Sequence, residues 1–148
     1  MNIENLYKHF LECTEVTTDT RKCVAGSMFF ALKGETFNGN KFAAKAIEEG
    51  CKYAVIDEPK YQTDKTILVD DCLKALQQLA NYHRQTLKTP IIGVTGTNGK
   101  TSIADFTRQL MKKLGYSAAS IGTVGVVSDV AENAETLATP DSVTLHRI

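Results

Sequence analysis

The sequence predicts an α/β protein in two parts, a small N-terminal α/β domain in residues 1–87 and the start of a parallel-sheet domain in residues 88–148. Three observations lead to this prediction. Short runs of β-branched residues alternate with amphipathic segments at helical spacing. The stretch "KTP" at residues 88–90 interrupts the alternation, because proline disfavours helix in the residue before it. The stretch "PIIGVTGTNGKTS" then places a glycine-rich loop between an apolar run and a helix.

Composition narrows the class of protein. The 148 residues are 43% hydrophobic, enough for a packed core, and 17 Lys and Arg balance 17 Asp and Glu. This balance argues against a nucleic-acid partner or a membrane surface, and no apolar run reaches membrane-spanning length. The N-terminal "MNIENLYKHFLE" lacks the continuous apolar core of a signal peptide. We therefore expect a soluble, cytoplasmic, monomeric protein.

Cysteines and histidines give no sign of a metal site or a catalytic base. The cysteines form no CxxC pair and have no histidine at zinc-ligand spacing, which indicates reduced thiols. They are Cys13, Cys23, Cys51 and Cys72. Two histidines lie on expected helical faces and are predicted to pack or to lie on the surface, and the third is near the end of the chain. They are His9, His83 and His146.

The first domain is expected to open with a helix, followed by two short strands. Apolar residues at i, i+3 and i+4 spacing predict the helix: Ile3, Leu6, Tyr7, Phe10 and Leu11. The strands are predicted in "VTTDTR" and "SMFFALK", with the turn-prone "CVAG" between them. After the loop "GETFNGN", residues 41–49 are rich in helix formers and stop at Gly50, so they predict a second helix.

The rest of this domain is predicted as two strands and a long helix. The strands are "KYAVID" and "TILVD", divided by a loop at Pro59. The helix is expected to be capped by Asp70 and to run to about Leu87. Although Asp70 and Asp71 form a carboxylate pair in the sequence, capping is their expected role. The apolar face of the helix is predicted at Leu73, Leu76, Ala80, His83 and Leu87.

The second part reads as strand, loop and helix. The run "IIGVT" at residues 91–95 is short, β-branched and bounded by glycine, as a buried parallel strand should be. A helix is predicted from Thr101 to the glycine at position 115, with an apolar stripe at Ile103, Phe106, Leu110 and Leu114. Two further strands are predicted in "SAASIG" and "VGVV". The polar "SDVAENAETLATPDS" after them is expected to be loop.

The glycine-rich loop predicts a phosphate site. A tight turn between a strand and a helix directs backbone N–H groups and the positive end of the helix dipole at one point. Lys100 would add a positive charge at the outer phosphates, and the Thr101 hydroxyl is placed to bind Mg²⁺. The spacing is GxxGxxGKT and not the strict GxxxxGK[ST]. The plainer alternative is a glycine-rich turn with an incidental lysine, but the order of strand, loop, GKT and amphipathic helix favours ATP binding and phosphoryl transfer.

The stretch "GVTGTNGKT" resembles the ATP loop of the Mur ligase family, cytoplasmic enzymes that extend the peptide of UDP-N-acetylmuramic acid in peptidoglycan synthesis. In that family ATP phosphorylates the carboxylate of the UDP-linked peptide, and the amine of an amino acid or dipeptide displaces phosphate to form an amide. The resemblance implies a P-loop ATP-binding domain in residues 88–148, with a catalytic Lys100 and Mg²⁺ held by Thr101. The implied ATP site is Gly96, Thr97, Asn98, Gly99, Lys100, Thr101 and Ser102. Folylpolyglutamate synthetases share this chemistry, but their loop usually reads GKGS, so Thr101 argues against them.

Residues 1–92 resemble the family member that adds D-alanyl-D-alanine. The segments "TDTR" and "ALKGETFNG" carry this resemblance, which implies that residues 1–87 bind the UDP-muramyl substrate. The implied site residues are Thr20, Arg21, Lys33, Asn38 and Gly39. Each of them taken alone is equally a turn residue or a solvated charge. Their combination favours a binding site.

Residues 93–148 resemble a different member, which adds the third residue of the peptide, diaminopimelate or lysine. The segments "TSIADFTRQLMKKLGYSAASIGTVGV" and "ATPDSVTLHRI" carry this resemblance. In that member a TTPD segment contacts the muramyl substrate, which implies that Thr139 and Asp141 bind it here, while Ala138 replaces the first threonine. The chain thus resembles two members of one family, as a chimera or a divergent member would.

Two functional hypotheses follow. The first is the N-terminal part of an ATP-dependent amide ligase that adds D-alanyl-D-alanine, with the third-residue ligase as the alternative. The second is a non-catalytic module that binds a nucleotide or a UDP-sugar. About 34 residues follow the loop helix, fewer than a P-loop domain normally needs, so we expect a truncated chain without activity of its own.

Overall fold

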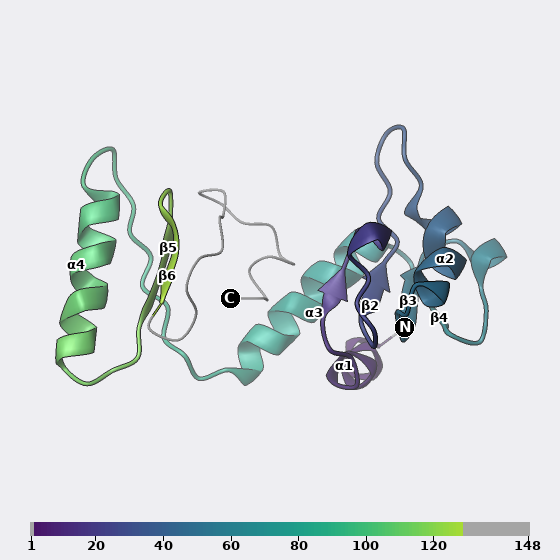
Figure 1. The fold of residues 1–148 in the computed structure, drawn as a ribbon, viewed down its shortest axis with the longest axis horizontal. Helices are drawn as coiled ribbons and strands as arrows, with labels where there is room; N and C mark the ends of the chain where they lie inside the picture. The colour runs from purple at the N-terminus through teal and green to yellow at the C-terminus, as the bar shows by residue number, and fades with distance from the viewer. Residues whose placement is uncertain (1, 129–148) are drawn as a thin grey trace. The chain divides into compact units, whose positions relative to one another are not determined.

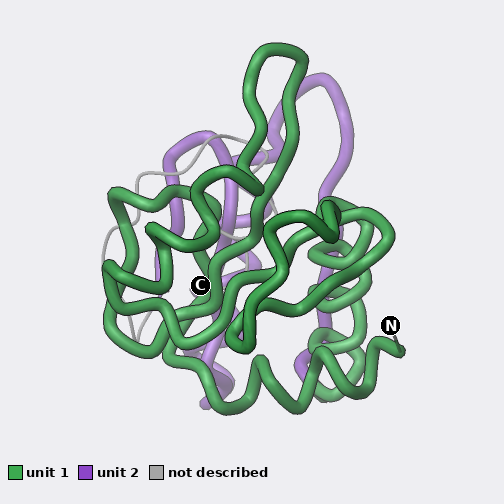
Figure 2. Tube along the Cα trace, turned by 90° about the vertical axis from the view of Figure 1, so that its right-hand side faces the viewer, with its two compact units in different colours: residues 1–88 green, residues 89–148 purple. Residues whose placement is uncertain are grey.

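The computed structural model describes residues 2–128, which belong to two compact units divided after Lys88 (Figures 1 and 2). The first unit contains one parallel sheet in the order β1-β2-β3-β4. Its strands are β1 (Val16–Thr17), β2 (Met28–Phe30), β3 (Tyr53–Ile56) and β4 (Thr66–Leu68). The first unit is therefore an α/β domain, as the sequence predicts, and the structure adds that its sheet is parallel throughout.

Helices cover both faces of this sheet. The α-helices of the first unit are α1 (Ile3–Leu11), α2 (Ala43–Glu48) and α3 (Cys72–Thr86). Helix α2 packs on β3, while α1 packs on α3, which contacts β2. Successive residues of a strand point to opposite faces, and all three residues of β2 are buried, so both faces are shielded from water.

The first helix is confirmed, but the strand predicted in "VTTDTR" is shorter than expected. After Thr17 the chain turns into the 3₁₀ helix η1 (Thr20–Lys22). The Asp19 side chain accepts a hydrogen bond from the Arg21 N–H at 3.0 Å and so caps this turn. This local hydrogen bond competes with a strand ladder, because a short acceptor side chain favours a turn.

Helix α3 differs from the prediction in its cap and in its buried face. Asp71, not Asp70, caps it, since the Asp71 side chain accepts from the Lys74 N–H at 3.0 Å. Its buried residues are Cys72, Ala75, Leu76 and Leu79. Leu73 and Leu87, predicted on the apolar face, are 51% and 47% exposed. The buried face of α3 is shifted by about one residue from the predicted face. The reason is that α1 and β2 pack on α3 and cover this side of it.

The predicted helix at residues 41–49 is present with a different beginning. A 3₁₀ turn, η2 (Gly39–Phe42), precedes α2, and the Asn38 side chain caps it by accepting from the Asn40 N–H at 3.0 Å. A third 3₁₀ turn, η3 (Pro59–Tyr61), connects β3 to β4. η2 follows β2 and η3 follows β3, and polar side chains lie close together at these ends of the two strands.

The second unit contains helix α4 (Lys100–Lys113) and the strands β5 (Ala119–Gly122) and β6 (Gly125–Ser128). The helix and both strands are confirmed. The strands pair antiparallel as a hairpin, and α4 packs on β5. The apolar stripe of α4 is more than half exposed in the described structure, at Ile103, Phe106, Leu110 and Leu114.

The strand predicted in "IIGVT" is wrong. Residues 91–95 have no regular structure, and Ile91 and Ile92 are 73% and 65% exposed. A strand requires a neighbour that completes its ladder, and in the described part of the second unit β5 and β6 pair with each other. No helix of residues 2–128 has the length and hydropathy required to cross a bilayer.

Candidate functional site

The predicted substrate residues of the first unit lie at one edge of its sheet. Turn η1 follows β1, the loop that carries Lys33 and Asn38 follows β2, and Asp57 with Glu58 follows β3. Because these strands are parallel, their carboxyl ends share one edge. In open parallel sheets, ligands bind beyond these carboxyl ends at a point where the strand order reverses. The order β1-β2-β3-β4 contains no reversal, so the structure brings the predicted residues to the carboxyl end of the sheet without such a point beside them.

Thr20 and Arg21 lie in η1, and the guanidinium of Arg21 points to solvent. The Arg21 Nη2 and Nε groups donate to the Asp19 carboxylate at 2.8 and 3.0 Å. These hydrogen bonds lower the pKa of Asp19 to about 2. The side chain of Arg21 is 87% exposed, so its pairing with Asp19 leaves the guanidinium open to a second anion.

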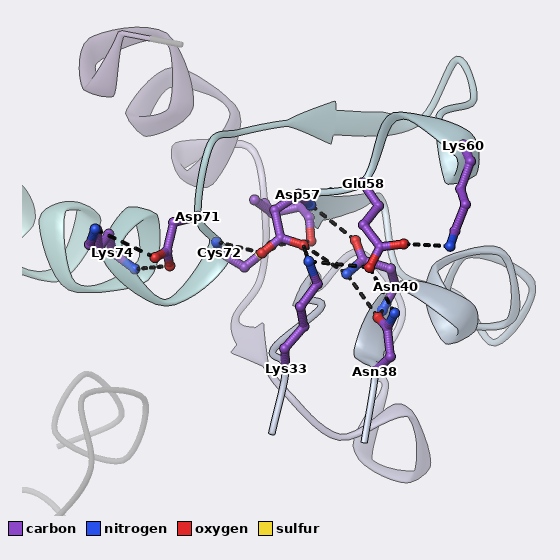
Figure 3. A network of polar contacts seen from close by, with 10 residues as sticks. Lys33, Asn38, Asn40, Asp57, Glu58, Lys60, Asp71, Cys72 and Lys74 are labelled. Atoms are coloured by element: carbon purple, nitrogen blue, oxygen red, sulfur yellow. Dashed lines mark hydrogen bonds and ion pairs between the residues drawn. The ribbon is translucent and has the colours of Figure 1, made fainter. Parts of the chain in front are cut away.

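Lys33 is tied to two carboxylates that the sequence analysis did not identify (Figure 3). Its Nζ lies 2.8 Å from Asp57 Oδ1 and 3.2 Å from Glu58 Oε1. Asn38 Nδ2 also donates to Glu58 Oε1, at 2.8 Å. Together these contacts fix the ends of the loop between β2 and η2 against the end of β3.

The centre of this network is a reciprocal pair between Asn40 and Asp57. Asn40 Nδ2 donates to Asp57 Oδ1 at 2.8 Å, and the Asp57 backbone N–H donates to Asn40 Oδ1 at 3.0 Å. Asn40 is fully buried. The second carboxylate oxygen of Asp57 accepts from the Cys72 N–H at 3.3 Å, which connects the network to the first turn of α3.

The electrostatics of the two carboxylates favour their charged forms. Burial raises the pKa of Asp57, but Lys33 and the hydrogen bond from Asn40 outweigh burial, so the pKa lies below its ordinary value. Hydrogen bonds from Lys60 and Asn38 lower the pKa of Glu58 to about 2. The network is therefore ionised at neutral pH. Asp57 was detectable from the sequence as the polar residue that ends the predicted strand "KYAVID".

Gly39 is required by close packing of the backbone. A Cβ at this position would lie 2.5 Å from Leu32 O and 2.7 Å from Ala31 C. Its own N–H donates to Leu32 O at 2.9 Å. The predicted residues Lys33, Asn38 and Gly39 are thus part of one structured turn, while Thr20 and Arg21 belong to the neighbouring turn.

In the second unit the glycine-rich loop leads directly into α4. Gly96 and Gly99 have φ angles of 141° and 78°, which side chains rarely adopt. Lys100 Nζ donates to Gly96 O and, at 3.4 Å, to Thr97 O, so its side chain folds back across the loop. The Thr101 hydroxyl lies 3.3 Å from that of Thr123 in the hairpin.

This loop fits a phosphate group. The first N–H groups of a helix have no acceptor within it, and α4 begins at Lys100 directly after the left-handed Gly99. Lys100 is exposed and ends at the same loop. The predicted residues Gly96 to Ser102 are contiguous and include two hydroxyls at the helix start. Thr101 and Ser102 also line a hollow formed with β5 and β6.

For Mg²⁺ the protein offers few ligands in the described residues. No group of three or more His, Cys, Asp or Glu within residues 2–128 is placed to hold a metal ion. Mg²⁺ usually takes one or two protein oxygens and completes its shell with phosphate and water, so the Thr101 hydroxyl fits that role. Thr139 and Asp141 lie outside the described residues.

Family profiles cover both units. Residues 12–84 match the profile described as "Mur ligase family, catalytic domain", and residues 94–148 match that described as "Mur ligase middle domain". The two matched segments follow the division of the structure into units.

Curated relatives carry the name UDP-N-acetylmuramoyl-L-alanyl-D-glutamate–2,6-diaminopimelate ligase. The relative from Mesorhizobium japonicum is 39% identical over 142 residues, covering 93% of this chain and 29% of the relative. The relative from Bradyrhizobium diazoefficiens is 40% identical, and the match covers 93% of this chain and 28% of the relative. The relative from Geobacillus kaustophilus is 37% identical, and the match covers 87% of this chain and 27% of the relative. The chain spans less than a third of the length of these relatives.

Solved structures similar to this chain include MurF ligases. The MurF ligase of Thermotoga maritima in complex with ADP is 25% identical, with a TM-score of 0.59 over 70% of this chain and 24% of its own. A MurF structure from Acinetobacter baumannii is 27% identical, with a TM-score of 0.59 over 76% and 27%. The expectation of a chimera is not confirmed, because one kind of curated relative matches both halves of the chain.

Proposed function

We infer that this chain, which belongs to the Mur ligase family, carries the substrate-binding domain and the start of the ATP-binding domain of an ATP-dependent amide ligase. The substrate domain is residues 1–87, and the ATP-binding part is residues 88–148. The observation that carries this proposal is that the two family profiles match the two structural units, one profile to each unit. Each unit also contains one of the two predicted sites.

We propose that the ligase adds the third residue of the muramyl peptide, and specifically diaminopimelate. Curated diaminopimelate ligases support this choice over D-alanyl-D-alanine addition, because they are 37–40% identical across both halves of the chain. Solved structures do not separate the two members in this way, since MurF ligases are 25–27% identical over 70–76% of this chain and a diaminopimelate ligase is 22% identical over 91%. The proposed acceptor is UDP-N-acetylmuramoyl-L-alanyl-D-glutamate, the compound named in the curated relatives.

In the first unit, we assign the diphosphate and uridine to the carboxyl edge of the sheet. Arg21 is an exposed cation there, and Thr20 adds a hydroxyl in the same turn. Lys33, Asn38 and Gly39 would contribute backbone groups, while the side chains of Lys33 and Asn38 hold the loop through Asp57 and Glu58. Thr139 and Asp141 remain proposed contacts to the muramyl peptide.

In the second unit, we assign the ATP phosphates to residues Gly96 to Ser102. ATP supplies the phosphoryl group that activates the substrate carboxylate. Lys100 would leave the carbonyl of Gly96 and neutralise the outer phosphates, since a phosphate is a stronger acceptor for an ammonium group than a carbonyl. The N–H groups at the start of α4 would hold the phosphates in place, and Thr101 would bind Mg²⁺.

Binding measurements on residues 1–148 test the substrate assignment. Calorimetry should give tighter binding of the UDP-muramyl dipeptide than of the tripeptide. Arg21→Ala should weaken dipeptide binding about 10- to 100-fold, the value of a charge-assisted hydrogen bond, while the neighbouring Lys22→Ala should change it little. Tighter binding of the tripeptide would favour D-alanyl-D-alanine addition, and binding of neither would overturn the substrate domain.

A second titration tests the ATP site. Lys100→Ala should weaken ADP or ATP binding by a similar factor, whereas Lys113→Ala, at the far end of the same helix, should leave it unchanged. Equal affinities of the wild type and Lys100→Ala would show that the loop is only a turn.

We further propose a cytoplasmic location, where ATP and UDP-linked precursors are found. We also propose that the protein is a monomer, which light scattering would test.

A further inference from the structure

Two cysteines that are far apart in the sequence meet in the first unit. Cys23 follows the 3₁₀ turn η1, and Cys51 lies two residues before β3. The Cys51 thiol points at Cys23, with the two Sγ atoms 2.9 Å apart. All four cysteines of the described structure are free thiols. The sequence, with 27 residues between these two and no CxxC motif, gives no indication of this pair.

The backbone around the pair is held by hydrogen bonds between the same two segments. Gly26 N–H donates to Gly50 O at 2.9 Å, and Lys52 N–H donates to Ser27 O at 2.7 Å. The Ser27 hydroxyl lies 3.1 Å from Cys51 Sγ. Since bonds on either side fix the chain, the proximity of the sulfurs comes from the fold and not from two mobile side chains.

We propose that Cys23 and Cys51 form a reversible disulfide site, oxidised by a small-molecule disulfide such as oxidised glutathione. A disulfide requires an S–S distance of about 2.05 Å, so the sulfurs need to approach by only about 0.9 Å. Cys51 is 3% exposed, whereas Cys23 is partly exposed. The small disulfide therefore reacts first at Cys23.

The exchange proceeds in two balanced steps. The Cys23 thiolate attacks one sulfur of oxidised glutathione, which forms a mixed disulfide and releases one glutathione thiolate. The Cys51 thiolate then attacks the Cys23 sulfur, forms the internal disulfide and releases the second glutathione. The two protein thiols together lose two electrons and two protons, and the small disulfide is reduced to two thiols.

The other two cysteines are arranged differently. The Cys13 thiol donates to the His9 carbonyl at 3.2 Å, and the Cys72 thiol donates to the Val55 carbonyl at 3.4 Å. Burial raises the pKa of Cys23 to about 12, so Cys23 is held as a thiol at neutral pH and its attack on a disulfide is slow. The disulfide would tether the end of η1 to the start of β3.

The test uses residues 1–148, first reduced and then incubated with oxidised glutathione for several hours. Denaturation, alkylation and intact mass should show two alkylated thiols, no retained glutathione, and four alkylated thiols after reduction. Peptide mapping should link Cys23 to Cys51. Cys51→Ser should stop at a glutathione adduct on Cys23, because the second step is removed, whereas Cys13→Ser should still form the internal disulfide.

The wild-type peptide map decides the proposal even if a variant folds poorly. Four alkylatable thiols after oxidation, a stable glutathione adduct on the wild type, or a cross-link through Cys13 or Cys72 would each overturn it. The readout requires no substrate, so it is independent of the ligase assignment.

Discussion

Asn40 and Asp57 hold each other by two hydrogen bonds, one from the Asn40 amide to the carboxylate at 2.8 Å and one from the Asp57 backbone N–H to the amide oxygen at 3.0 Å. This pair joins the turn after β2 to the end of β3. Because Asn40 is fully buried, the loss of either partner leaves polar groups that water cannot reach.

Asn40→Ala should therefore destabilise the first unit by at least about 2 kcal/mol, since each buried polar group left without a partner costs about 1–3 kcal/mol. Asn81→Ala makes the same chemical change at an exposed position of α3 and should shift stability by less than about 0.5 kcal/mol. Urea unfolding followed by circular dichroism measures both. Equal midpoints for the two variants would contradict the structural role of the pair.

Gly39→Ala should destabilise the same turn, because the new Cβ would lie 2.5 Å from the Leu32 carbonyl oxygen, a backbone atom that cannot move freely. The expected loss is about 1–3 kcal/mol, typical of overpacking. Gly34→Ala in the same loop has no atom within 4 Å of its added Cβ, so it should be neutral or slightly stabilising. Thermal unfolding of both variants provides the comparison, and a neutral Gly39→Ala would show that the turn rearranges.

Acid should weaken the first unit through Asp57 and Glu58. Both have a pKa below the ordinary value, so they stabilise the folded state above about pH 4 and lose that contribution as pH falls toward about pH 2. The double variant Asp57→Asn, Glu58→Gln should lose less stability than the wild type over this range. Asp64→Asn, at an exposed position, should follow the wild-type curve. Denaturant unfolding at several pH values tests this, and parallel curves for wild type and double variant would rule it out.

Gly99→Ala should disturb the start of α4. Its φ of 78° lies in the left-handed region, which costs a residue with a side chain about 1–2 kcal/mol. Gly93→Ala, earlier in the same loop, adds a Cβ to open space and should be tolerated. Amide hydrogen exchange of Ile103, whose N–H donates to Gly99 O at 2.9 Å, should be faster in Gly99→Ala only. Unchanged exchange in both variants would mean that the loop does not need this conformation.

Some features of the fold are encoded by residues that are close in the sequence, and others are not. The loop and α4 were predicted from their own residues, because the glycines set the backbone and the apolar spacing sets the helix. The order of helices and strands in the first unit was predictable for the same reason. The residues implied for the UDP site were found by resemblance to a family, and the structure places them in two turns at one edge of the sheet.

What the sequence alone determined is thus the type and order of most elements and the glycine-rich loop before α4, since each depends on neighbours within a few residues. The tertiary structure decided the Asn40–Asp57 pair, the Cys23–Cys51 contact and the buried face of α3. It also decided that residues 91–95 form no strand among the described residues. Each of these depends on a segment distant in the sequence, because ladder pairing, burial and side-chain contacts exist only after the sheet has brought such segments together.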